Sequence, residues 1–106
     1  MTDFRFQTPQ PVLTRAEIAA NVAALPMPDG WTLQDDVALW EGLFMGLGFE
    51  DIAVKRGGKA DQWRARFFAL RRAAVGDGVL TLDAQKALLA IVRKRANQTQ
   101  SNPEKE

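Results

Sequence analysis

The sequence predicts an all-α protein, with a tri-helical core and one additional helix at each end. Apolar residues recur at intervals of three and four along most of the chain, which is typical of helices that bury one face. Threonines at capping positions begin several of these segments, and glycine or proline ends them. No stretch shows the alternation expected of a strand. At 106 residues, the chain suits a single domain, expected at 14–96 between an extended arm (1–13) and a disordered tail (97–106).

The first two expected helices both begin with a capping-box pattern. Thr14 is followed by Glu17 and Thr32 by Asp35, so each threonine can accept a backbone N–H while the carboxylate reaches back. Pro26 ends the first helix, because a proline disfavours helical geometry in the residue before it. The apolar faces comprise Ile18, Val22 and Leu25 in the first helix, and Val37, Trp40, Leu43, Phe44 and Leu47 in the second.

Glycines separate the three remaining helices. Phe49 to Arg56 is a short helix that Gly57-Gly58 breaks, and the next runs from near Lys59 to Val75. Gly76-Asp77-Gly78 is a turn, after which Thr81 caps the last helix. The last helix has apolar residues at Leu82, Leu88, Leu89 and Val92 and ends in the basic run Arg93-Lys94-Arg95, which complements the helix dipole.

The segment from Asp61 to Ala73, DQWRARFFALRRA, mixes aromatic and basic residues. On a helical wheel, Trp63, Phe67, Leu70 and Ala74 share a narrow arc that must be buried. Arg64, Arg71 and Arg72 lie outside that arc, and Arg66 flanks its other edge together with Lys59. Phe68 falls between Arg64 and Arg72. We expect another helix to bury Phe68; the alternative is an exposed contact for a partner.

The charge of the chain is unevenly distributed. Residues 1–54 hold two arginines and eight acids, a balance of −6, whereas residues 55–96 hold eleven bases and three acids, a balance of +8. The tail adds −1, which gives the net charge of +1. This asymmetry indicates one basic side on the domain, suited to a polyanion.

The composition argues against an enzyme. Cysteine and histidine are absent, so the thiolate and imidazole ligands of metal sites and the commonest general base are missing. Asp35 and Asp36 read as helix-capping charges, and Gly57-Gly58 fits no phosphate-binding loop. We therefore expect no catalytic residues, no metal and no cofactor. No apolar run approaches the roughly 20 residues of a membrane span, so a cytoplasmic protein with no membrane partner is expected.

The order of motifs resembles the Myb/SANT family of homeodomain-like helix-turn-helix domains. The matching residues are Trp31-Thr32, Asp35-Asp36, Leu39, Ile52-Ala53, the run Trp63 to Phe67, and Leu70, so the resemblance covers about residues 31–72. It implies a core built on Trp31, Trp40 or Leu39, Ile52, Trp63 and Phe67. It also implies that the 59–75 helix is a recognition helix.

The resemblance places base-reading positions at Asp61, Arg64 and Ala65. Lys55, Arg56, Lys59, Arg71 and Arg72 would then contact the phosphates. The expected function is a small DNA-binding protein that recognises double-stranded DNA, and the alanine- and arginine-rich composition favours a bacterial regulator. The alternative is a SANT-like interaction module that does not bind DNA. In that case a homodimer or another protein partner would dock through Phe68 and the last helix.

Overall fold

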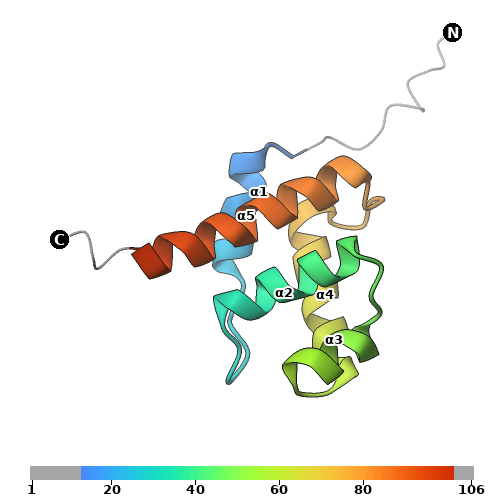
Figure 1. Ribbon diagram of the computed structural model, residues 1–106. Helices are drawn as coiled ribbons and strands as arrows, with labels where there is room; N and C mark the ends of the chain where they lie inside the picture. The colour runs from blue at the N-terminus through green and yellow to red at the C-terminus, as the bar shows by residue number, and fades with distance from the viewer. Residues whose placement is uncertain (1–12, 102–106) are drawn as a thin grey trace, which may run out of the picture.

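The computed structural model of the chain describes residues 13–101, with side chains as far as Gln98. This part of the chain contains helices and no strand, which confirms the all-α class (Figure 1). None of these helices combines the length and apolar character needed to cross a membrane. The five helices are α1 (Arg15–Ala24), α2 (Leu33–Phe44), α3 (Phe49–Arg56), α4 (Ala60–Val75) and α5 (Leu82–Ser101).

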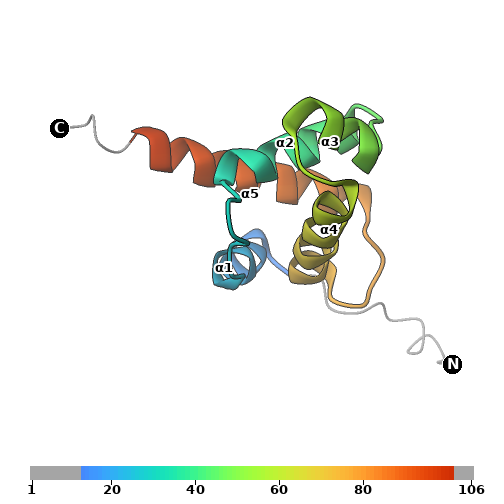
Figure 2. The same cartoon turned by 90° about the horizontal axis from the view of Figure 1, so that it is seen from below.

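The helices form two layers. α2 and α5 lie side by side and antiparallel in one layer, while α1 and α4 lie in the other (Figures 1 and 2). The short α3 packs between the end of α2 and the start of α4. α5 makes its most extensive contact with α2 and smaller contacts with α1 and α4. It therefore closes the core from the side of α2.

The core lies between these two layers and is mostly aliphatic and aromatic. Trp40 is fully buried at its centre, and its ring lies 5.4 Å from that of Phe67. Trp31 and Trp63 also pack against each other, with ring centroids 4.6 Å apart and the ring planes tilted by 57°. The arc predicted on the fourth helix is confirmed, since Trp63, Leu70 and Ala74 are buried and Phe67 is partly buried. The other large buried side chains are Ile18, Val22, Leu39, Ile52, Leu88, Ile91 and Val92.

The helix starts follow the local sequence closely. Both predicted capping boxes are formed, Thr14 with Glu17 and Thr32 with Asp35. Thr81 accepts the backbone N–H of Ala84 at 3.1 Å, as a cap on α5 should. The end of α5 differs from the prediction. The helix continues to Ser101, so the segment from residue 97 to residue 101 is helical where a disordered tail was expected. Residues 1–12 of the predicted arm (1–13) and the last residues, 102–106, lie outside the described residues.

Several side chains correct the sequence analysis. Phe44, assigned to the apolar face of the second helix, is 38% exposed at the end of α2, and Leu47, assigned to the same helix, lies in the α2–α3 connection. Phe68, expected to be buried, is 53% exposed, because neither α1 nor α5 packs over that side of α4. Leu82, assigned to the apolar face of the last helix, is 56% exposed at its first turn. Arg66, placed at the edge of the buried arc, is only 3% exposed.

Arg66 is buried because Asp36 lies opposite it. Its Nε and Nη2 donate to the two carboxylate oxygens of Asp36 at 2.8 and 2.9 Å. The indole N–H of Trp31 donates to the same carboxylate at 2.8 Å. A third contact joins Arg66 Nη1 to the carbonyl oxygen of Pro26 at 3.3 Å. This two-pronged pair satisfies the buried charges, and it fixes the α1–α2 connection and the start of α2 against α4.

Candidate nucleic-acid interface

The outward face of α4 consists of Asp61, Arg64, Ala65, Phe68 and Arg72, all of which are exposed. α4 lies behind α2 and α5 in Figure 1, and Figure 2 shows it with α1 in the layer below α2 and α5. The side that it turns toward the other helices holds the buried residues. The outward face is therefore open, and α5 does not cover it.

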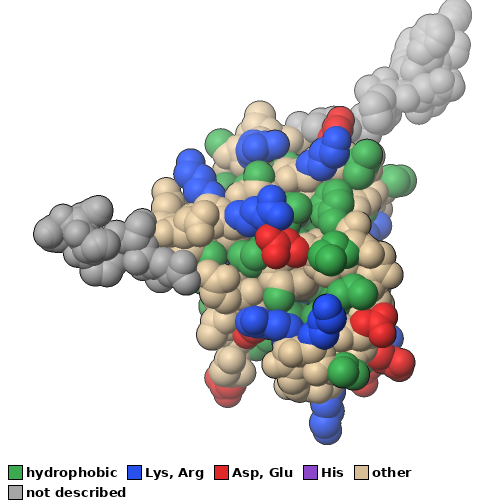
Figure 3. All heavy atoms as spheres, in the orientation of Figure 1, with side chains coloured by type: hydrophobic (Ala, Val, Ile, Leu, Met, Phe, Trp, Pro, Cys, Tyr) green, Lys and Arg blue, Asp and Glu red, His purple; other side chains and the backbone are tan. Residues whose placement is uncertain are grey.

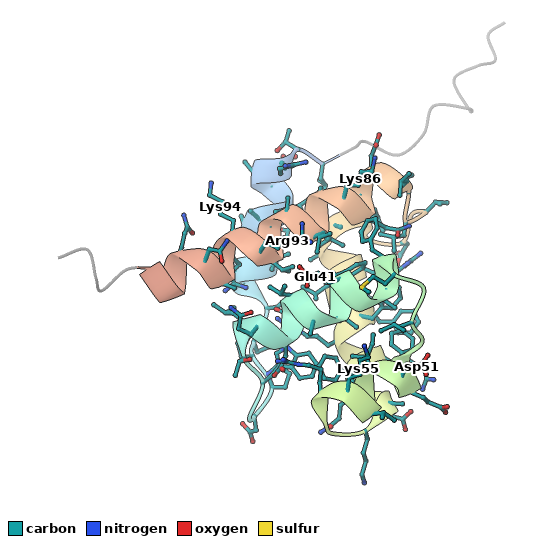
Figure 4. The ribbon with its side chains drawn as sticks, viewed as in Figure 1. Glu41, Asp51, Lys55, Lys86, Arg93 and Lys94 are labelled. Carbon is teal, nitrogen blue, oxygen red and sulfur yellow. The ribbon has the colours of Figure 1, made fainter. Side chains whose placement is uncertain are left out.

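A three-residue turn sets the direction in which α4 leaves α3. Gly57 and Gly58 have φ angles of 105° and 81°, which side chains rarely adopt. The indole N–H of Trp63 donates to the Gly57 carbonyl oxygen at 3.0 Å, so the core holds the turn. Gln62 accepts the backbone N–H of Lys59 at 3.0 Å and caps α4. Lys59 is thereby held at the start of α4, while Lys55 lies in the last turn of α3 (Figure 4).

Some of the cations predicted to contact phosphates are exposed to solvent, and others are bonded to groups of the protein. Lys55, Lys59 and Arg72 are exposed. Arg56 is also exposed, but its Nη2 lies 2.7 Å from a carboxylate oxygen of Asp35. Arg71 is half-buried and donates to the carbonyl oxygen of Gly78 at 2.8 Å, which ties α4 to the α4–α5 turn. Arg71 therefore helps to hold the α4–α5 turn.

Two of the predicted base-reading residues are bonded to each other. Arg64 Nη1 lies 2.7 Å from Asp61 Oδ1, and the guanidinium carbon lies 5.4 Å from the centre of the Phe49 ring. The aromatic ring and the carboxylate together restrict the guanidinium to the α3 side of the face. The Asp61 side chain is 90% exposed, so the pair breaks readily in favour of a stronger anionic partner. Ala65, the third position, is exposed and apolar.

The pKa of Asp35, which forms an ion pair with Arg56, is shifted from its ordinary value. Its partial burial raises the pKa, but hydrogen bonds with Arg56 and Thr32 and the charge of Arg56 outweigh that effect, so the pKa is lowered from 3.8. Asp35 is thus ionised at neutral pH and holds the Arg56 side chain across α2 and α3.

The face formed by α2 and α5 has a different character. Figure 3 shows basic, acidic and apolar side chains intermixed on it. Lys86, Arg93 and Lys94 come from α5, and Glu41 of α2 lies between them and the lower part of the molecule (Figure 4). Arg93 and Glu41 form an ion pair at 2.8 Å. The positive balance of residues 55–96 is therefore divided between two faces.

The sequence analysis missed a pocket beside the start of α4. It has a volume of about 290 Å³ and lies between the α1–α2 connection and α4, with Trp31, Ala65 and Ala69 among its lining residues. No local pattern signals this pocket, since it forms only where two distant segments meet. No protein-family model, curated protein or solved structure matches the chain.

Proposed function

We propose that the protein is a small DNA-binding protein, a bacterial transcription regulator, that inserts the outward face of α4 into the major groove of double-stranded DNA. The observation that supports this proposal most is that Arg64 and Arg72 are exposed on one face of α4 that α5 leaves open. A helix of this diameter fits the major groove. The basic residues on and beside it suit the phosphates on either side of the groove.

The order α2, α3, turn, α4 also supports a Myb/SANT-like helix-turn-helix. The residues that the resemblance assigned to the core, Trp31, Ile52 and Trp63, are buried or half-buried. In such domains the third helix of the core is the one that enters the groove, and here that helix is α4. The turn of three residues between α3 and α4 agrees with the compact connection of this motif.

The number of free cations sets the expected salt dependence. Lys55, Lys59 and Arg72 are exposed, and Arg64 is paired only with Asp61, whose side chain is 90% exposed. Arg56 is paired with Asp35, whose side chain is only 18% exposed, and Arg71 donates to the Gly78 carbonyl oxygen. Four phosphate contacts predict a slope of about −3 to −4 for the logarithm of the binding constant against the logarithm of salt concentration. This slope can be measured by fluorescence anisotropy of a labelled 20-base-pair duplex between about 50 and 200 mM salt.

Two alanine variants, one on α4 and one on α5, test which face of the protein binds DNA. Arg72→Ala should weaken binding and reduce the magnitude of the salt slope by about 1, because one phosphate contact is lost. Lys94→Ala removes an exposed cation from α5, away from α4, and should leave the slope unchanged. Equal effects of the two substitutions would contradict the assignment to α4. Absence of binding by folded protein at 50 mM salt would overturn the proposal itself.

A protein-interaction module is the second candidate. The exposed Phe68 favours it, as does the exposed Asp61, which a phosphate backbone would repel. In this case Phe68→Ser would change the molecular mass in solution or abolish capture of a partner, and no duplex would bind at low salt. A variant that keeps both its mass and its DNA affinity would remove Phe68 from either interface.

A further inference from the structure

We propose that the outward face of α4 recognises the methyl groups of thymine, with Phe68 and Ala65 as the contacting side chains. This inference rests on the proposed DNA binding and specifies the chemistry of the duplex. The ligand would be a major groove that presents thymine methyl groups between two phosphate contacts. Arg64 and Arg72 would make those contacts.

Phe68 lies on the outward face of α4, between Arg64 and Arg72. It lies four residues after Arg64 and four residues before Arg72, so the three side chains form one row along the helix. The two arginines are about 12 Å apart along the helix axis, with an exposed aromatic ring between them. An apolar side chain flanked by cations complements a surface that is apolar at its centre and anionic at its edges. The major groove at a thymine has this arrangement.

Phe68 is also held in position by the core. Its ring packs against that of Phe67 at 5.1 Å between centroids, with an interplanar angle of 73°. Phe67 in turn contacts Trp40 at 5.4 Å and Phe49 at 5.5 Å. The exposed ring is therefore the outermost member of an aromatic cluster, and binding would restrict little additional side-chain freedom.

The neighbouring positions favour methyl contacts over hydrogen-bonded base readout. Ala65 can offer a base only an apolar contact, and thymine is the base that presents a methyl group in the major groove of unmodified DNA. Between Arg64 and Arg72 the outward face carries only Ala65 and Phe68, whose side chains neither donate nor accept hydrogen bonds.

Other exposed apolar residues lack this setting. Met45 and Val79 lie in connections between helices, and Val54 lies on α3 with Glu50 one turn before it. Only in the case of Phe68 do arginines stand one turn away on both sides, within the described residues. This charge arrangement favours an anionic groove over a second copy of the chain as the partner of Phe68.

The test compares two duplexes that differ only in the methyl group. A 20-base-pair duplex enriched by the protein from a random library is remade with deoxyuridine at every thymine, which keeps each hydrogen-bonding group and every charge. Loss of one buried methyl corresponds to about fourfold in affinity, so loss of two contacts should weaken binding about 15-fold. Phe68→Ala should reduce this ratio to below about fourfold, while the salt-dependent binding remains. Val54→Ala is the control and should keep the full ratio.

Each outcome separates the inference from the proposed function. Equal affinity of the wild-type protein for the thymine and uracil duplexes would overturn methyl recognition and leave DNA binding intact. Failure to bind either duplex at 50 mM salt would overturn the proposed function and the inference with it. If Phe68→Ala halves the molecular mass in solution and leaves the thymine-to-uracil ratio unchanged, Phe68 joins two copies of the chain and the inference is wrong. The comparison of duplexes with the wild-type protein needs no variant to fold.

Discussion

Replacing Asp36 with alanine should destabilise the protein more than any substitution on its exposed faces. The Asp36 carboxylate accepts two hydrogen bonds from Arg66 and one from Trp31, at 2.8 to 2.9 Å. The side chains of Asp36 and Arg66 are only 1% and 2% exposed, so solvent does not screen their interaction. Without the carboxylate, the Arg66 guanidinium stays buried with no counter-charge.

The expected loss of stability follows from the cost of leaving one charge of a buried ion pair without its partner. Removing one partner of a buried ion pair costs about 3–5 kcal/mol, because the remaining charge has lost its solvation and its partner. A domain of this size has a total stability of about 5–15 kcal/mol. With a shift of about 4–8 °C for each kcal/mol, Asp36→Ala should lower Tm by about 12–40 °C. The double variant Asp36→Leu, Arg66→Met removes both charges and should recover much of this loss.

Urea unfolding followed by far-ultraviolet circular dichroism would measure these differences without relying on fluorescence from Trp31, which contacts the pair. Asp61→Ala, which breaks the exposed pair with Arg64, is the control and should change stability by about 0.5 kcal/mol or less. A loss below about 1 kcal/mol for Asp36→Ala would refute the reasoning, since it would place Arg66 in contact with water. A double variant less stable than Asp36→Ala would refute it as well.

Further predictions concern acid stability, the turn before α4 and the exposed ring. The pKa of Asp35 is lowered in the folded protein from its ordinary value of 3.8. Its contribution to stability is therefore complete above that value and disappears as the pH falls through the lower folded value. The urea midpoint of Asp35→Asn should accordingly approach that of the wild type in acid. Gly58→Ala should cost about 1–3 kcal/mol, because φ is 81° and the added Cβ would lie 2.7 Å from Gln62 Oε1. Gly46 also has a positive φ, of 88°, but a Cβ added there would meet no atom within 4 Å, so Gly46→Ala should destabilise the protein less than Gly58→Ala. Thermal unfolding of both variants would measure the difference, and equal losses of stability would exclude a steric role for Gln62. Phe68→Ala should change Tm by only a few degrees, because the ring is 53% exposed, and a large fall would show that it supports the core.

The sequence by itself determined where most helices begin and end. Thr14, Thr32 and Thr81 cap helices through bonds to residues three positions away, and such contacts need no distant partner. Glycine with positive φ ends α3 and α4 for an equally local reason. The buried arc of α4 was also readable, because its spacing follows from the helical repeat alone.

The tertiary structure alone decided which basic and aromatic residues remain available. Arg64 and Arg66 stand two positions apart on α4, yet one is exposed and the other is buried, because Asp36 of α2 lies opposite Arg66. Phe68 is exposed because α5 packs mainly on α2 and leaves the outer side of α4 open. These outcomes depend on how segments far apart in the chain meet, and neither charge nor hydrophobicity along one helix specifies which neighbour will cover it.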